Sequence, residues 1–243
     1  DYAWRGIELV GANNCTLDGC TVRNINALVQ SIGIYIRSTA ALTGSNNTVT
    51  GCTVHDVGAE GIYIYTNTAA ELGGSDPLAV DSNTITGCLA YNCAYDGYQV
   101  RGNHTTIKPT NTTVSNCESR NNGTGSGDVG GMQIHGEGTV VDSCYIHDNQ
   151  GKYGGIYGGG DDVTIMNCRI CNNYGYLAFN VAGITAHEGT NWFIYHNTIH
   201  DNNLAEVASK GIRFYDCGAG CEAKNNIVWG EDSQCVLSGT NDP

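Results

Sequence analysis

The most regular feature of the sequence is a short phrase in which a glycine is followed by alternating apolar and polar residues. The copy Gly33-Ile34-Tyr35-Ile36 is typical. The copies begin at Gly6, Gly33, Gly61, Gly97, Gly131, Gly155, Gly183 and Gly211. Alternation over four to six residues predicts a β-strand with one buried and one exposed face. The sequence therefore predicts eight equivalent strands, one in each copy.

A second phrase follows each copy of the first and places a small residue at a bend between two apolar positions. Its central residues are Cys20, Cys52, Cys88, Cys117, Cys144, Cys168, Asn197 and Asn226. They lie 24 to 36 residues apart, and three short strands per repeat of this length are typical of one coil of a solenoid. We therefore predict an all-β solenoid over residues 1–243, a single domain of about eight coils with three short parallel strands each and almost no helix.

The alternating phrases resemble those of the right-handed parallel β-helix family, the pectate-lyase-like superfamily of carbohydrate-binding proteins and sugar hydrolases. The resemblance covers residues 5–230 and is specific for fold rather than function, because this fold carries lyases, hydrolases, esterases, epimerases, tailspikes and non-catalytic modules. In the family, the bend usually holds stacked asparagines, as at Asn197 and Asn226. No capping element is evident at either end of the repeats, so we predict uncapped ends, either cut from a longer solenoid or covered by other copies.

The cysteines allow two interpretations. Twelve cysteines without a zinc-ribbon pattern favour an oxidising compartment. Adjacent parallel strands lie about 4.7–4.9 Å apart, within the Cα separation of about 4.4–6.8 Å that a disulfide tolerates. The candidates for disulfides between neighbouring coils are Cys20, Cys52, Cys88, Cys117, Cys144 and Cys168, and Cys217 with Cys221 is a candidate for a stapled loop. The alternative is a column of small buried thiols that fill space.

Charge and composition narrow the class of partner. The chain has 24 Asp and Glu against 11 Lys and Arg, a formal net charge of −13, which disfavours nucleic acid and anionic membrane surfaces. No apolar run approaches the roughly 20 residues of a membrane span. We expect a secreted or cell-surface protein. Its candidate N-glycosylation sites are Asn14, Asn46, Asn103, Asn111 and Asn122.

The outward residues of the first phrase are rich in tyrosine and arginine although the chain is acidic. In the resembled superfamily, polysaccharide usually lies along this face. Tyrosine rings stack on sugars and arginine pairs with carboxylates, so we predict that an extended, uronate-containing polysaccharide binds here. The predicted binding residues are Tyr35, Arg37, Tyr63, Tyr65, Gln99, Gln133, Arg213 and Tyr215. The alternative is that these residues only stack on one another across the strands.

If the face is catalytic, the chemistry it favours is β-elimination from a uronate. Such a reaction needs a base, a cation that neutralises the carboxylate, and a Tyr or His that protonates the leaving oxygen. The predicted catalytic residues are Arg101, His135, Lys152, Tyr157 and His187, around a bare floor at 158–160. No metal site is predicted, and Glu60 with Asp96 is the only candidate pair for a calcium ion.

A structural protein is the alternative function. Missing caps, a cysteine column and few groups with obvious chemistry favour a β-helix that stacks on further copies of itself. Its product would be an extracellular filament, sheath or surface layer stabilised by disulfides. Particle shape separates the two hypotheses, since filaments favour the structural protein and monomers favour a binding or processing domain.

Overall fold

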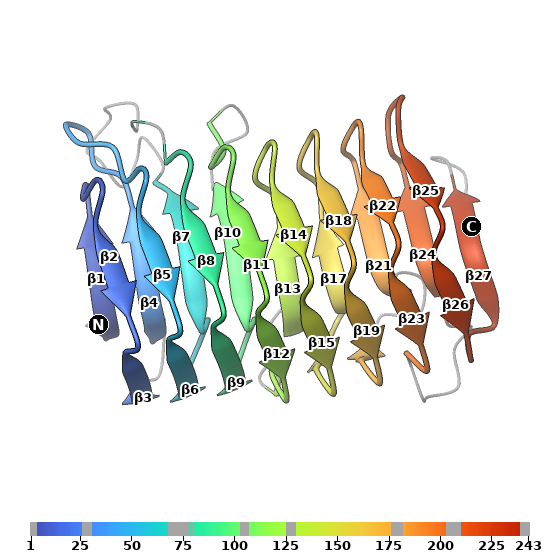
Figure 1. Ribbon diagram of the computed structural model, residues 1–243, viewed down its shortest axis with the longest axis horizontal. Helices are drawn as coiled ribbons and strands as arrows, with labels where there is room; N and C mark the ends of the chain where they lie inside the picture. Colours follow the sequence, from blue (N-terminus) through green and yellow to red (C-terminus); the bar gives the residue numbers. More distant parts are fainter. Residues whose placement is uncertain are drawn as a thin grey trace.

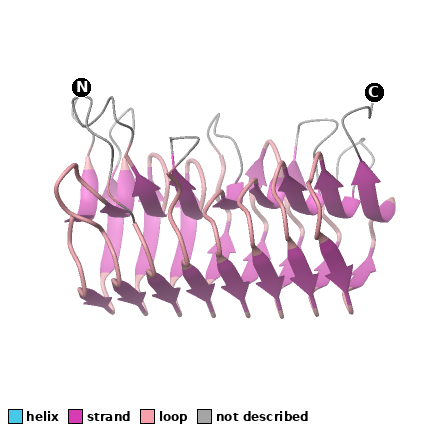
Figure 2. Cartoon of the chain, turned by 90° about the horizontal axis from the view of Figure 1, so that it is seen from above, coloured by secondary structure: helices cyan, strands magenta, loops and turns pink. Residues whose placement is uncertain are grey.

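The fold is a right-handed parallel β-helix. The computed structural model describes residues 4–25, 31–67, 78, 80–102, 107–124, 130–175, 182–202 and 210–238. Figure 1 shows successive coils side by side along the long axis, from β1 near the N-terminus to β27 near the C-terminus. The described residues contain strands and loops but no helix, and hence no helix suited to crossing a membrane (Figure 2).

Three long sheets, named A, B and C here, run along the solenoid. Sheet A consists of β1 (Arg5–Val10), β4 (Ile32–Arg37), β7 (Ile62–Thr66), β10 (Tyr98–Gly102), β13 (Gly130–Ile134), β17 (Gly154–Gly158), β21 (Ala182–His187), β24 (Lys210–Tyr215) and β27 (Ser233–Ser238). Sheet B consists of β2 (Thr16–Asp18), β5 (Thr48–Thr50), β8 (Thr84–Thr86), β11 (Thr113–Ser115), β14 (Val140–Asp142), β18 (Thr164–Met166), β22 (Phe193–Tyr195) and β25 (Glu222–Lys224). Sheet C consists of β3 (Thr21–Ile25), β6 (Thr53–Val57), β9 (Leu89–Cys93), β12 (Glu118–Arg120), β15 (Tyr145–His147), β19 (Arg169–Cys171), β23 (Thr198–His200) and β26 (Ile227–Trp229). The short strands β16 (Gln150–Gly151) and β20 (Tyr174–Gly175) pair separately.

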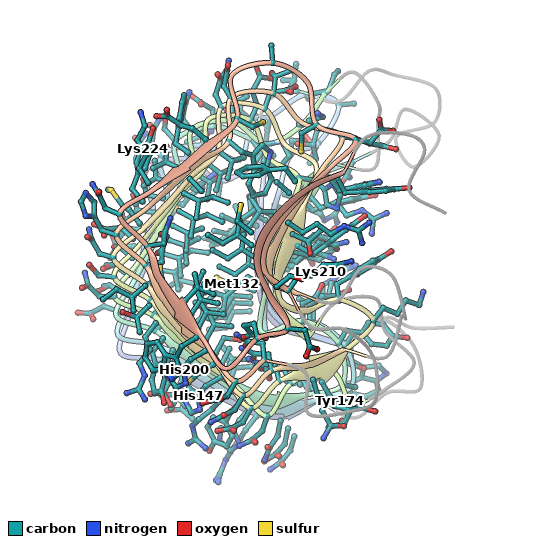
Figure 3. The ribbon with its side chains drawn as sticks, turned by 90° about the vertical axis from the view of Figure 1, so that its right-hand side faces the viewer. Met132, His147, Tyr174, His200, Lys210 and Lys224 are labelled. Atoms are coloured by element: carbon teal, nitrogen blue, oxygen red, sulfur yellow. The ribbon has the colours of Figure 1, made fainter. Side chains whose placement is uncertain are left out.

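Every strand pairs in parallel with the strand one coil away, so equivalent residues stack in register. The row through the middle of sheet A is Ile7, Ile34, Ile62, Tyr98, Met132, Ile156, Ile184 and Ile212. Figure 3, viewed down the long axis of the solenoid, shows Met132 inside it and His147, His200 and Lys224 on its outer surface. The predicted eight coils of three short strands are therefore confirmed.

Steric crowding explains the glycine that opens each first phrase. A Cβ at Gly33 would collide with Val54 of sheet C and would lie 2.6 Å from the carbonyl oxygen of Gly61. A Cβ at Gly155 would collide with the carbonyl of Gly183. Glycine therefore recurs because sheet A passes close to the inward side chains of sheet C and to the next coil.

The second phrase forms the bend between sheets B and C, where its cysteines are thiols. All twelve cysteines lie within the described residues and are free, so the predicted disulfides of Cys20, Cys52, Cys88, Cys117, Cys144, Cys168, Cys217 and Cys221 are not present. Each sulfur at this bend lies near a main-chain carbonyl, as Cys117 Sγ does at 3.1 Å from the Ser115 oxygen, and thiols of neighbouring coils such as Cys88 and Cys117 also hydrogen-bond to each other. Burial raises the pKa of the Cys52 thiol to about 11, which keeps it protonated at neutral pH. The structure therefore matches the packing interpretation.

An asparagine ladder that the sequence did not predict lines the corner after sheet C. The side-chain Nδ2 of Asn122 donates to Asn149 Oδ1 at 3.0 Å, and Asn149 and Asn173 donate in the same way to the next coil at 2.9 Å. Asn122 is fully buried. Its predicted glycosylation is therefore wrong, because a buried and hydrogen-bonded amide cannot accept a glycan.

The other predicted glycosylation sites fall into two groups. Asn14, Asn46 and Asn111 are exposed at left-handed turn positions with φ of 50–57°, and glycosylation there stays a prediction. Asn103 lies outside the described residues.

Candidate functional site on the outer face of sheet A

The outer face of sheet A carries two rows of side chains. The central row comprises Tyr35, Tyr63, Gln99, Gln133, Tyr157, Thr185 and Arg213. The terminal row, near the C-terminal ends of the strands, comprises Arg37, Tyr65, Arg101, His135, Gly159, His187 and Tyr215. Most of the central row is buried, whereas the terminal row is half-buried from Arg101 onward. The accessible part of the predicted binding face is therefore this stretch of the terminal row.

The tyrosines of the first coils pack on one another. The ring centroid of Tyr35 lies 5.3 Å from that of Tyr63 and 6.0 Å from that of Tyr65, and the Arg5 guanidinium lies 4.4 Å from the Tyr35 centroid. Arg37 Nε lies 2.7 Å from a carboxylate oxygen of Glu8. These contacts match the cross-strand alternative, so the sugar-stacking role predicted for this end of the face is not supported.

The glutamines of the central row belong to a buried polar network. Gln99 Nε2 donates to Asp96 Oδ2 at 3.0 Å and also to the side-chain oxygen of Gln133. Asp96 Oδ1 accepts from the main-chain N–H of Gly130 at 2.8 Å. With both side chains at most 5% exposed, Gln99 and Gln133 are inaccessible to an external glycan, which corrects their predicted role.

The predicted calcium pair is also corrected by this network. Both oxygens of Asp96 accept hydrogen bonds, and Asp96 is buried. Burial raises the pKa of Glu60, which disfavours its charged form. Among the described residues, no group of three or more His, Cys, Asp and Glu side chains is arranged to hold a metal ion.

Three predicted catalytic residues meet where the central row, through Tyr157, adjoins the terminal row, through His135 and His187. The Tyr157 hydroxyl lies 3.0 Å from His187 Nδ1. The Tyr157 ring centroid lies 5.8 Å from that of His135 and 5.7 Å from that of His187. The three side chains come from successive coils, so the in-register stacking of sheet A produces the cluster.

Only one glycine of the predicted floor faces this cluster. A Cβ at Gly159 would lie 3.2 Å from His135 Nδ1 and 2.7 Å from the carbonyl oxygen of His187. Cβ atoms at Gly158 and Gly160 would instead collide with main-chain carbonyls of the preceding coil. Gly159 therefore leaves space between the two histidines, and its neighbours serve the close packing of the coils.

The electrostatic surroundings of His135 are cationic. Burial, together with Arg101, Lys108 and His187, lowers the pKa of His135 to about 3. Lys108 was not predicted from the sequence, because it lies in the loop after β10, outside the repeated phrases. Its Nζ lies 3.6 Å from Asp161 Oδ2. His135 is therefore a neutral imidazole at ordinary pH, next to fixed positive charge.

The remaining predicted residues divide between the site and its surroundings. Tyr215 stacks on His187 with ring centroids 5.0 Å apart and extends the terminal row. Arg213 is 1% exposed, with its guanidinium 4.5 Å from the Tyr215 centroid, so it is a buried support and not a surface ligand. Lys152 lies between β16 and β17, at the opposite end of β17 from the terminal row. Its role as an alternative base stays a prediction.

The cluster combines the groups that proton transfer near an anion requires. Neutral His135 can accept a proton, and the Tyr157 hydroxyl paired with His187 can deliver one. The Arg101 guanidinium and the Lys108 ammonium can hold a carboxylate. These groups come from four successive coils, those of β10, β13, β17 and β21, and from the loop after β10.

Comparison with known proteins identifies the fold. The family described as right handed beta helix region matches residues 3–127 and 80–242. The A-module of mannuronan C-5 epimerase AlgE4 from Azotobacter vinelandii is similar with a TM-score of 0.55 and 17% identity, over 93% of this chain and 62% of that chain. PfbA, a surface adhesin of Streptococcus pneumoniae, is similar with a TM-score of 0.52 and 12% identity, over 91% of this chain and 70% of that chain.

The comparison ends at the fold. No curated protein matches the chain, and identities of 12–17% to the two solved structures show shared architecture alone. The match to the family extends over nearly the whole sequence. The chain belongs to the right-handed β-helix family.

Proposed function

We propose that the protein binds an extended, uronate-containing polysaccharide along the terminal row of sheet A and cleaves it by β-elimination. The observation that carries this proposal is the cluster of neutral His135 and the Tyr157–His187 pair, together with Arg101 and Lys108. The histidines of sheet C have different neighbours, because each ring Nδ1 lies 2.6–2.9 Å from a carboxylate oxygen of the following aspartate.

The roles follow from the chemistry of each group. Arg101 binds the uronate carboxylate and stabilises the negative charge that develops on it. His135 takes the proton from the carbon next to the carboxylate, the carbon–oxygen bond to the leaving sugar breaks, and a carbon–carbon double bond forms. Tyr157 gives its hydroxyl proton to the leaving oxygen. His187 Nδ1, 3.0 Å from the Tyr157 hydroxyl oxygen, orients the phenol. After the product leaves, the Tyr157 phenolate regains a proton from water and His135 releases its proton to water.

The two solved structures with a similar fold are compatible with a glycan as the partner, but the proposal does not depend on them. One is named as a mannuronan epimerase and the other as a surface adhesin, so this architecture serves both sugar chemistry and surface attachment. We infer a secreted or cell-surface location, because extended polysaccharides of this kind lie outside the cell. Exposed Asn14, Asn46 and Asn111 are compatible with that location.

A panel of acidic and neutral glycans tests the proposal. Binding is measured by calorimetry, and cleavage by the ultraviolet absorbance of the unsaturated uronate product. We expect binding and cleavage of a uronate polymer. If no glycan binds and negatively stained samples contain filaments, the structural-protein hypothesis replaces this one.

A further inference from the structure

We propose that Lys108 is a second substrate-binding cation, which forms with Arg101 a clamp around His135 for one carboxylate. The inference rests on the proposed function, because it concerns the same site. It adds a residue outside the repeats and a coupling between ligand charge and the protonation of His135.

The main chain brings the Lys108 segment to the site. A Cβ at Gly102 would lie 3.1 Å from Lys108 Cα, so the two segments are in close contact beside Arg101. The main-chain N–H of Glu137 donates to the carbonyl of Pro109 at 2.9 Å. Lys108 is thus fixed between the residue after Arg101 and the turn that follows His135.

The side chain of Lys108 spans one coil. It starts in the coil of β10, passes the coil of β13 and reaches Asp161, in the coil of β17, at 3.6 Å. The turn that it passes contains Gly136 and Gly138, and the Gly138 N–H donates to the Asp161 carbonyl at 2.9 Å. Small residues therefore leave a path for the lysine across the coil that carries His135.

Asp161 is a fixed anchor for this lysine. Its Oδ1 accepts from the main-chain N–H and from the hydroxyl of Thr190, both at 2.9 Å. Burial tends to raise the pKa of Asp161, but the Thr190 hydrogen bonds and Lys108 together lower it. The carboxylate is therefore charged, and it directs the ammonium without consuming all of its donors, since an ammonium has three.

Arg101 supplies the other half of the clamp. It is half-buried, and no hydrogen bond or ion pair joins its guanidinium to another side chain in the described part of the chain. By contrast, Arg37 pairs with Glu8, and Arg120 pairs with Glu118. In a chain with 13 more acidic than basic groups, an unpaired and half-buried guanidinium has a geometry suited to an external carboxylate.

Ligand binding should change the basicity of His135. The groups that face it are Arg101 from β10, Lys108 from the following loop, Tyr157 from β17 and His187 from β21. Both cations lower the pKa of His135 in the free protein. A carboxylate held between them offsets their charge, so the pKa of His135 rises on binding. The imidazole then becomes a stronger base only when an acidic sugar is present.

Nuclear magnetic resonance of the His135 ring tests the clamp directly. The titration of His135 is recorded in the intact protein, alone and with trigalacturonate, and again with the carboxyl-reduced neutral trisaccharide. The variants are Lys108→Gln and a matched control, Lys224→Gln. Lys224 also pairs with a carboxylate, Glu222 at 2.5 Å, but lies on the outer face of sheet B (Figure 3).

We expect trigalacturonate, but not its neutral counterpart, to raise the pKa of His135 in the parent protein. Lys108→Gln should raise that pKa in the free protein and weaken trigalacturonate binding by about 10- to 100-fold, the loss of one charge-assisted hydrogen bond. Lys224→Gln should match the parent. The clamp is overturned if trigalacturonate leaves the His135 titration unchanged, or if Lys108→Gln titrates and binds like the parent.

The outcomes also separate this inference from the proposed function. A parent protein that shows the His135 shift but forms no unsaturated product confirms the clamp and contradicts only the β-elimination. A parent protein that cleaves a uronate polymer while Lys108→Gln behaves identically confirms the reaction and contradicts the clamp.

Discussion

Histidines stand in register on two faces of this solenoid, and the two sets have different surroundings. On sheet C, each histidine is followed by an aspartate whose carboxylate oxygen approaches the ring Nδ1. The pairs are His55 with Asp56, His147 with Asp148 and His200 with Asp201, at 2.7, 2.6 and 2.9 Å. The aspartates have φ of 52–54°, a turn that returns the carboxylate to the preceding ring. Each sheet C histidine therefore has a carboxylate partner in its own turn, and His147 Nε2 also lies 3.2 Å from Glu118 Oε1 of the preceding coil.

Aromatic neighbours complete the environment on sheet C. His55 stacks on Tyr91 with ring centroids 4.6 Å apart, and His200 stacks on Trp229 at 4.3 Å. On sheet A, the cluster is instead assembled from distant segments: Lys108 and His187 lie far from His135 in the sequence, yet both affect it. The comparison shows that the two sets differ in the charge of their neighbours, with carboxylates beside the rings on sheet C and cations beside His135 on sheet A.

The largest effect should follow from replacing one histidine on each face. His135→Gln removes the proposed base and should lower the rate of glycan cleavage by about 10²- to 10⁴-fold. His147→Gln, on sheet C, should retain the parent rate. Initial rates of product absorbance measure both. Equal losses in the two variants would remove the functional distinction between the faces.

Tyr157→Phe should have the next largest effect. It removes the hydroxyl that lies 3.0 Å from His187 Nδ1 and should lower cleavage by about 10²-fold, since one acid–base group is lost. Glycan affinity should change little. Tyr145→Phe on sheet C is the control, and calorimetry with rate measurements checks both. A Tyr157→Phe variant with the parent rate would exclude the phenol as proton donor.

Gly159→Ala should disturb the site without removing a functional group. The added Cβ would lie 2.7 Å from the His187 carbonyl oxygen and 3.2 Å from His135 Nδ1, so either the coil or the ring must shift. Crowding of this kind costs about 1–3 kcal/mol of unfolding free energy. Urea unfolding measures it. Unchanged stability and activity would show that Gly159 does not limit the packing between the two histidines.

The fold and part of the site follow from the sequence for a physical reason. The alternation of apolar and polar residues and the repeated glycines reflect the packing of each coil on its neighbours. This packing recurs in every coil, so the repeated pattern is enough to predict it. The same register places His135, Tyr157 and His187 together. Lys108 could not be predicted, because its position depends on a loop whose path the repeat does not specify.

The burial of some outward-facing side chains of sheet A also could not be predicted from the sequence. Outward alternation predicts an exposed side chain at Gln99, Gln133 and Arg213, yet these are 1–5% exposed. Strand spacing also permits disulfides between adjacent coils, but it does not determine whether they form, and the cysteines are free thiols. A titration of unfolded protein with a thiol reagent should accordingly find close to twelve reactive groups.

The smallest predicted effect concerns the pH dependence of sheet C. Hydrogen bonds from His55 and Asn92 lower the pKa of Asp56. A carboxylate with a lowered folded pKa stabilises the fold above its unfolded pKa of about 3.9, and this contribution disappears as the pH falls through the folded pKa. His55→Gln should raise the pKa of Asp56 and reduce stability at neutral pH by at most about 1 kcal/mol, because the pair is partly exposed. Carboxyl carbon resonances and urea unfolding at two pH values measure these changes, and an unchanged Asp56 pKa would contradict the pairing.

The most direct test of the account compares two arginines against a uronate polymer by calorimetry. Among the described residues Arg101, near His135, has no side-chain partner, whereas Arg120, on sheet C, lies 2.9 Å from Glu118. We predict that Arg101→Ala weakens binding by about 1.5–3 kcal/mol, the loss of a charged hydrogen bond, and that Arg120→Ala binds like the parent. Binding by Arg101→Ala that equals the parent, or an equal loss in both variants, would contradict the assignment of the ligand site to sheet A.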